Sequence, residues 1–216
     1  MPTTLLKATV GGGKTEAVLH EIFQTVHNLK TPFASVWTLL ATRRQEDNFR
    51  ARLAHLQSPN QVFFNIEIFH FYDLYTRLLD LAGQPQRHLD TVSRYSMLYD
   101  LLESLKPQLQ YFQSIALTSG FIQAVADLID ELKQNSVLPE DFARAAHTLK
   151  DQDLALIYSA YQNMLVEHHL VDKEGQGWLA LDLLKQDERL ASDVQMLVVD
   201  GYDIFTPVQA ELIALL

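Results

Sequence analysis

The sequence contains no cysteine at any of its 216 positions. Disulfide bonds, thiol catalysis and cysteine-ligated metal sites are therefore excluded within this chain, and the composition fits a reducing compartment. Long apolar runs are also missing, because none approaches the roughly 18 residues that a membrane-spanning helix needs. The first residues, Met-Pro-Thr-Thr, lack the basic and apolar regions of a secretory signal. We expect a cytoplasmic protein that has no membrane partner.

Basic residues are scarce as well: 17 Lys and Arg stand against 27 Asp and Glu, which gives a net charge of −10. This balance argues against a surface that binds nucleic acid everywhere, although it leaves room for a local DNA groove. The hydrophobic content of 48% is ordinary for a globular protein with a real core. Residues 210–216 read as a helix without a cap, so we interpret the chain as part of a longer protein.

What the sequence does contain is a glycine-rich loop near its N-terminus. Its eight residues are Ala8, Thr9, Val10, Gly11, Gly12, Gly13, Lys14 and Thr15. Glycines let successive backbone N–H groups surround a phosphate, and the helix expected next adds its own unpaired N–H groups. In such a loop Lys14 reaches the β- and γ-phosphates and the Thr15 hydroxyl holds Mg²⁺. The pattern predicts an ATP–Mg²⁺ site; the alternative is a glycine turn followed by Lys-Thr by chance.

Short apolar runs alternate with helical patterns in the first part of the chain and return near its end. We interpret the runs at 5–8, 34–40, 62–68 and 194–199 as buried parallel strands. Helices are expected to follow the first three runs, at 14–29, 45–56 and 71–81. This alternation predicts an α/β fold with a parallel sheet, in which ligands bind at the carboxyl ends of the strands.

Between about residues 87 and 192 the strand signals disappear and apolar residues recur at helical spacing. Pro139, followed by two acidic residues, is typical of a helix start. We therefore predict a P-loop core made of residues 1–86 and 193–216, into which residues 87–192 are inserted as an all-helical subdomain.

The apolar run that ends at Asp200 is the second candidate for nucleotide chemistry. In nucleotide-binding α/β domains an acid at this position joins the Mg²⁺ shell, and Lys14 with Asp200 would then form the catalytic pair. Because Mg²⁺ keeps several waters, one carboxylate and the Thr15 hydroxyl suffice. Hydrolysing enzymes usually place Glu next, whereas Gly201 has no side chain for acid–base work. Asp203 could substitute for it, or could simply form the turn after the strand.

The order of these motifs resembles that of superfamily 1 DNA helicases of the UvrD/RecB type. Segment 8–15 is similar to their first motif, which often begins with Ala. Segments 39–44 and 49–53 resemble the second, which touches single-stranded DNA, and 68–72 resembles the third. Segment 200–209, Asp-Gly-Tyr-Asp-Ile-Phe-Thr-Pro-Val-Gln, is similar to their acidic motif and closer to the AddB-type subunit of bacterial helicase–nuclease complexes.

The resemblance implies a RecA-like core, ATP and Mg²⁺ as cofactors, and a role in DNA repair and recombination beside a partner helicase–nuclease subunit. It implies a nucleotide contact from Gln209. It also implies contacts to single-stranded or duplex-end DNA, made by Thr42, Arg43, Arg44 and His70. Relatives of this type continue into a second motor domain and a nuclease domain with an iron–sulphur cluster. Residues of those domains are not assigned to this chain.

Some candidates keep a second interpretation. His70 could be a buried or capping residue, and the two arginines could be ordinary surface residues. His168 and His169 suggest metal ligands together with the nearby acids, but adjacent histidines point to different sides of a helix, which favours a structural role.

Three functional hypotheses follow. The first is an ATP- and DNA-binding helicase-like region in which Gly201 impairs hydrolysis. The alternative is an active translocase that uses Asp203 or a downstream acid as its base. A small-molecule kinase is the third class, but a kinase of this length should contain a substrate lid and a complete fold.

Overall fold

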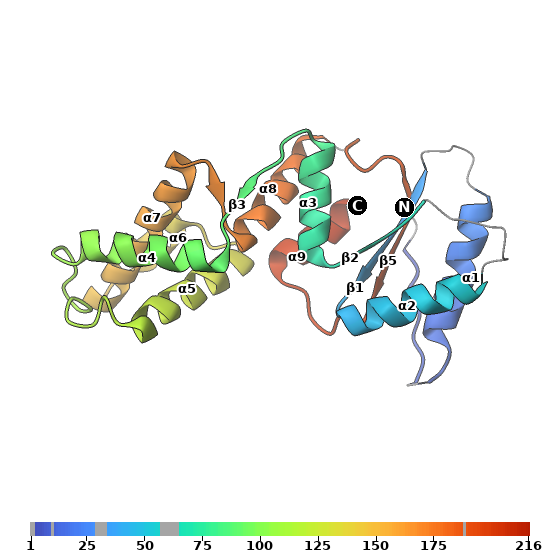
Figure 1. The fold of residues 1–216 in the computed structure, drawn as a ribbon, viewed down its shortest axis with the longest axis horizontal. Coiled ribbons are helices and arrows are strands. Elements are labelled where there is room, and N and C mark those ends of the chain that lie inside the picture. Colours follow the sequence, from blue (N-terminus) through green and yellow to red (C-terminus); the bar gives the residue numbers. More distant parts are fainter. Residues whose placement is uncertain (1–2, 10, 29–33, 57–64, 188) are drawn as a thin grey trace. The chain divides into compact units, whose positions relative to one another are not determined.

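The computed structural model describes residues 3–9, 11–28, 34–56, 65–187 and 189–216, and the chain divides into two units (Figure 1). The first unit is drawn from residues 1–74 and 188–204, together with Leu216. The second unit comprises residues 75–187 and 205–215. No helix in the described part of the chain is both long and apolar enough to cross a bilayer.

A three-stranded parallel sheet organises the first unit (Figure 1). Strands β1 (Ser35–Leu40), β2 (Ile66–Phe69) and β5 (Val194–Asp200) lie in the order β2-β1-β5. The central strand β1 pairs in parallel with both neighbours, and it is buried at every residue after Ser35. A strand buried on both faces reads as a continuous apolar run, which is why the sequence predicted it. The α/β class with a parallel sheet is confirmed; residues 62–64 of the third predicted strand lie outside the described residues.

The first predicted strand, residues 5–8, is wrong. Residues 3–9 form no strand, and the side chains of Leu5 and Leu6 are 76% and 43% exposed. Only two large apolar residues stand before Lys7, so the segment offers little apolar surface to offset the entropy cost of ordering it. An apolar run becomes a strand only where a sheet edge accepts it, and sequence pattern does not report that.

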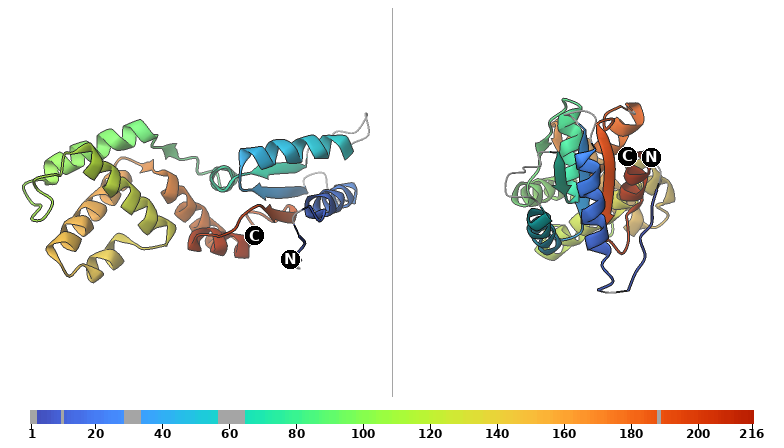
Figure 2. Two further views of the ribbon diagram at one scale, coloured as in Figure 1. Left: turned by 90° about the horizontal axis from the view of Figure 1, so that it is seen from below. Right: turned by 90° about the vertical axis from the view of Figure 1, so that its right-hand side faces the viewer.

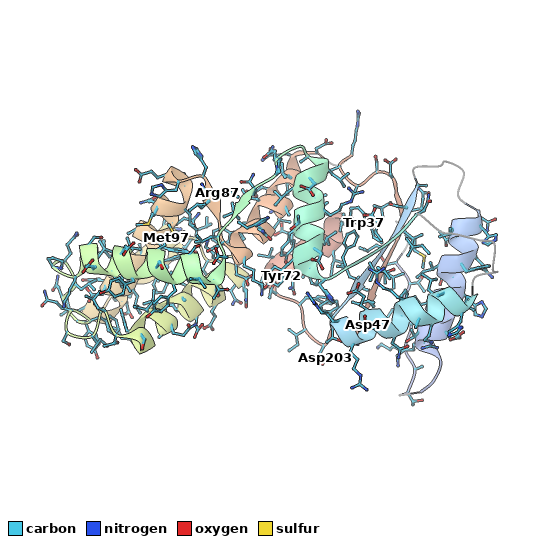
Figure 3. The ribbon with its side chains drawn as sticks, viewed as in Figure 1. Trp37, Asp47, Tyr72, Arg87, Met97 and Asp203 are labelled. Carbon is cyan, nitrogen blue, oxygen red and sulfur yellow. The ribbon has the colours of Figure 1, made fainter. Side chains whose placement is uncertain are left out.

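Helices α1 (Lys14–His27) and α2 (Arg43–Leu56) pack against the sheet and share one hydrophobic core with it. The buried members of this core are Leu19, Ile22, Val36, Leu40, Phe49, Leu53 and Val198. Trp37 is also buried, as predicted, with 2% of its surface exposed (Figure 3).

Helix α2 begins two residues before its predicted start because Thr42 and Gln45 form a capping box. The Gln45 N–H donates to Thr42 Oγ1 at 3.3 Å, and the Thr42 N–H donates to Gln45 Oε1 at 3.1 Å. This reciprocal pairing satisfies two of the N–H groups that a helix start leaves unpaired.

Helices dominate the second unit (Figures 1 and 2). Helix α3 (Phe71–Leu81) has the predicted bounds and enters this unit from Tyr75 onward. The helices that follow are α4 (Thr91–Leu105), α5 (Ser119–Gln134), α6 (Pro139–Ala145), α7 (Leu149–Glu167), α8 (Lys173–Gln186) and α9 (Pro207–Leu215). Helices α4, α5 and α7 enclose one apolar core.

The prediction that residues 87–192 are all helical is wrong in one detail. Strands β3 (Arg87–His88) and β4 (Leu170–Val171) pair in parallel. Each has only two residues, which is too short to carry a period of two, so no pattern in the sequence announces them.

Candidate nucleotide and DNA site

The glycine loop uses its glycines in two different ways. Gly11 and Gly13 both have φ of +78°, the left-handed region that residues with a Cβ rarely adopt. Gly12 is needed for space, because a Cβ there would lie 2.9 Å from the Ala8 Cβ and 3.0 Å from the Thr9 carbonyl oxygen. The Gly12 N–H donates to that same oxygen at 3.0 Å. The loop is therefore tightly turned in a way that only glycine supports.

Lys14 closes this loop from its C-terminal side. Its Nζ donates to the carbonyl oxygens of Ala8 at 2.8 Å and Thr9 at 3.3 Å. Helix α1 begins at Lys14, and its N-cap residue, Gly13, makes no side-chain capping bond. The start of α1 thus combines an ammonium group, unpaired first-turn N–H groups and the positive end of the helix dipole, which together suit a phosphate.

Asp200 ends strand β5, where it stands opposite Leu40 of β1. Figure 1 shows α1 beginning at the lower edge of the first unit, the edge where β1 and β5 also end. The described residues contain no group of three or more His, Asp or Glu side chains able to hold a metal ion. A divalent ion here would take the Thr15 hydroxyl and the Asp200 carboxylate from the protein and its other ligands from water and phosphate. That oxygen-poor set fits Mg²⁺, which retains waters.

Gly201 has φ of +84° and faces the side chain of Gln45. A Cβ built on Gly201 would lie 2.6 Å from Gln45 Oε1 and closer still to Nε2. The place beside Asp200 where a larger residue would begin is thus filled by an amide. Asp203, the other candidate base, is exposed on the loop that follows β5 (Figure 3).

His70 uses both ring nitrogens within the protein. Its Nδ1 donates to the Leu40 carbonyl oxygen at 2.8 Å, and its Nε2 lies 3.1 Å from Glu46 Oε2. Since both partners are acceptors, the ring makes both hydrogen bonds at once only in its doubly protonated form. Burial alone would raise the pKa of Glu46, but the bond and charge of Arg50 and the nearby His70 hold it below its ordinary value.

A second side chain also converges on the Leu40 carbonyl. The Tyr202 hydroxyl donates to it at 2.9 Å, and the Tyr202 ring meets Phe71 edge-on at 5.1 Å between centroids. Burial raises the pKa of Tyr202 to about 12, so the hydroxyl keeps its proton. His70 and Tyr202 therefore tie the segments after β2 and β5 to the end of β1.

The predicted DNA contacts Arg43 and Arg44 are the first two residues of α2, and both are exposed. Thr42 precedes them as the capping residue. Sequence reasoning missed Gln45, Glu46 and Tyr202, which surround these positions. The Thr-x-x-Gln spacing of a capping box was the one signal that would have singled out Gln45.

Gln209 lies in the second unit, where it forms a capping box of the same kind. Its Oε1 accepts from the Thr206 N–H at 3.1 Å, and its own N–H donates to Thr206 Oγ1 at 3.3 Å. The side chain thus begins α9.

The acids near His168 and His169 are engaged elsewhere. Asp172 pairs with Lys133, and Glu174 accepts a hydrogen bond from Gln134 at 3.1 Å. These contacts account for both acids through protein structure.

Comparison with known proteins points in one direction. A family model described as "ADDB, N-terminal" matches residues 6–216. An ATP-dependent helicase/deoxyribonuclease subunit of Caldanaerobacter subterraneus subsp. tengcongensis is 27% identical, over 99% of this chain and 18% of the relative. The proteins of the same name from Thermoanaerobacter sp. and Ruminiclostridium cellulolyticum are 23% and 29% identical, over 92% and 68% of this chain. The chain spans less than a fifth of the length of these relatives.

Proposed function

Because this chain belongs to the AddB N-terminal family, we propose that it is the ATP- and DNA-binding N-terminal region of a DNA-repair helicase–nuclease subunit. The observation that carries the nucleotide part is the glycine loop, where Gly11 and Gly13 adopt positive φ and Lys14 closes the turn. The relatives are named for ATP dependence, which agrees with this part of the proposal.

We propose a RecA-like P-loop core made of residues 1–86 and 193–216, with residues 87–192 inserted. The parallel order β2-β1-β5 supports it, because ligands of open α/β sheets bind outside the carboxyl ends of the strands. In this core the loop N–H groups and Lys14 bind the phosphates, and Thr15 with Asp200 holds Mg²⁺. When bound, the ion would neutralise charge on the terminal phosphates.

Hydrolysis in this region is proposed to be impaired. The residue after Asp200 is Gly201, which has no group to remove a proton from water. The runner-up is an active translocase in which Asp203 acts as the base; its exposure on the loop after β5 leaves it free to approach a ligand.

DNA is proposed to contact the carboxyl edge of the first unit through Thr42, Arg43 and Arg44. Exposed arginines at the start of a helix suit backbone phosphates, whether of a single strand or of a duplex end. His70 is proposed to act there by holding the Leu40 carbonyl and Glu46, so that the loop before α2 keeps its shape. A partner helicase–nuclease subunit and a cytoplasmic location complete the proposal.

The nucleotide site is tested by titrating a fluorescent ATP analogue with Mg²⁺ against residues 1–216 and the Lys14→Ala variant. We expect saturable binding that Lys14→Ala weakens by roughly tenfold to a hundredfold, because a hydrogen bond to a charged group contributes about 1.5–3 kcal/mol. Lys7→Ala, which changes an exposed lysine before the loop, is the matched control and should bind as the parent does.

Absence of saturable binding at millimolar nucleotide would refute the nucleotide site. Turnover of ATP decides between the two motor hypotheses. DNA-stimulated hydrolysis that Lys14→Ala and Asp203→Asn both abolish would favour the active translocase.

A further inference from the structure

The side chain of Gln45 stands where the residue after Asp200 would place its own. The Gln45 amide is the nearest group to the Cβ position of Gly201, at 2.6 Å for Oε1 and 2.7 Å for Cδ, with Nε2 closer still. These distances are far below van der Waals contact, so the amide and a side chain at position 201 exclude each other. Either Gly201 stays glycine, or Gln45 moves.

The orientation of the Gln45 amide is set by Thr42. Both the N–H and the hydroxyl of Thr42 lie 3.1 Å from Gln45 Oε1. Because a backbone N–H can only donate, the group that faces it must be the amide oxygen, and Nε2 is the other end. No acceptor for Nε2 lies among the described residues, and the side chain is exposed. The amide therefore offers an oriented N–H donor at the end of strand β5.

We propose that Gln45 replaces the missing residue at position 201 and donates an amide N–H to the terminal phosphate of a bound nucleoside triphosphate. This inference rests on the proposed nucleotide site. An amide donates hydrogen bonds to phosphate oxygens, but it has no basic atom that removes a proton from water. The Gln45–Gly201 pair thus distinguishes triphosphate from diphosphate without supplying the base for hydrolysis.

The pair also explains why a single Gly201→Glu change is insufficient to create a base. A glutamate at position 201 has to adopt positive φ and to displace the Gln45 amide, which opens the capping box of α2. Restoring an acid therefore requires a second change at Gln45.

Gln45→Glu is the sharpest test of the phosphate contact. Glutamate keeps the acceptor that a capping box requires, while it replaces the N–H donor by a second acceptor. We expect the Kd of Mg·ATPγS for residues 1–216 to rise on the order of tenfold, and the Kd of Mg·ADP to stay within about twofold. Asn48→Asp is the control, because it adds the same charge to α2 at an exposed position one turn later.

Equal weakening of Mg·ATPγS and Mg·ADP by Gln45→Glu, or no weakening of either, would overturn this inference and leave the nucleotide site standing. The inference is equally overturned when Asn48→Asp reproduces the selective weakening. Failure of the parent chain to bind either nucleotide overturns the proposed function together with this inference.

A thermal-unfolding cycle tests the Gln45–Gly201 contact without nucleotide. Gly201→Ala should lower the unfolding midpoint more in the parent than in the Gln45→Ala background, where only backbone strain remains. Gly83→Ala measures that strain alone, because Gly83 has φ of +66° and nothing within 4 Å of its Cβ position. Strictly additive shifts for the Gly201 and Gln45 changes would contradict the contact.

Discussion

Lys133 and Asp172 form an ion pair in which both side chains are completely buried, with Nζ 2.8 Å from each carboxylate oxygen. Asp172 also N-caps α8 by accepting from the Gly175 N–H at 2.8 Å, and it accepts from the Tyr161 hydroxyl at 3.1 Å. The Lys133 ammonium lies 5.6 Å from the Tyr161 ring centroid and 5.5 Å from that of Trp178. This network links α5, α7 and α8 within the second unit.

We predict that Asp172→Asn lowers the free energy of unfolding by about 3–5 kcal/mol, because it leaves the Lys133 charge buried without a counter-ion. Asparagine is itself a good N-cap, so the capping bond to Gly175 is retained and the loss of stability reports on the charge. Urea denaturation followed by circular dichroism measures the change. Asp90→Asn, at the exposed N-cap of α4, is the matched control and should destabilise the chain far less. Equal destabilisation in the two variants would contradict the prediction.

We predict that the acid limb of stability depends on the same pair. Burial by itself would raise the pKa of Asp172, but the charge and hydrogen bonds of Lys133 and the Gly175 N–H hold it below its ordinary value. In the unfolded chain an Asp titrates near about pH 3.9. The stabilisation by ionised Asp172 is therefore complete above about pH 4 and is lost as the pH falls through the lower folded pKa. The free energy of unfolding, measured at a series of pH values, should fall more steeply for the parent than for Asp172→Asn; parallel curves would show that Asp172 does not titrate in this way.

Asp153 provides a second stability prediction. Its buried carboxylate accepts the backbone N–H groups of Gln110, Tyr111 and Phe112 at 2.8–3.1 Å, and so holds the loop between α4 and α5. Asp153→Asn replaces one acceptor oxygen by an amide nitrogen, which we expect to cost about 1.5–3 kcal/mol in urea unfolding. The exposed Asp127→Asn should change stability by no more than about 0.5 kcal/mol. A destabilisation by Asp153→Asn as small as that of the control would refute the role of this carboxylate.

The arginines at the start of α2 provide a prediction for DNA. We expect Arg43→Ala/Arg44→Ala to weaken binding of single-stranded oligonucleotides of any sequence, because arginines that bind phosphates carry no sequence information. The slope of log K against log salt should shrink by about 0.7 for each phosphate that the variant no longer neutralises. Fluorescence anisotropy at several salt concentrations measures both effects. Arg144→Ala, an exposed arginine of the second unit, should leave the slope unchanged; an unaltered slope in the double variant would remove these arginines from the interface.

Part of the fold was predictable because it depends on neighbours in the chain. Helix α3 has the predicted bounds of 71–81, and α6 begins at Pro139 as its sequence indicates. The buried strand β1 announced itself by its apolar run. The order of motifs from the glycine loop to Asp200 was also sufficient to indicate the family to which the chain belongs.

Of the candidate site, the sequence alone determined the glycine loop, since its conformation follows from the residues within it. Only the tertiary structure decided which distant groups meet. Residues 5–8 are apolar enough for a strand, yet no sheet edge pairs with them, and Gln45 gains its place only because β1 and β5 lie side by side. Lys133 finds Asp172 because two helices pack together. Local propensity acts over a few residues, whereas these meetings depend on how separate elements pack, and a linear pattern carries no record of that packing.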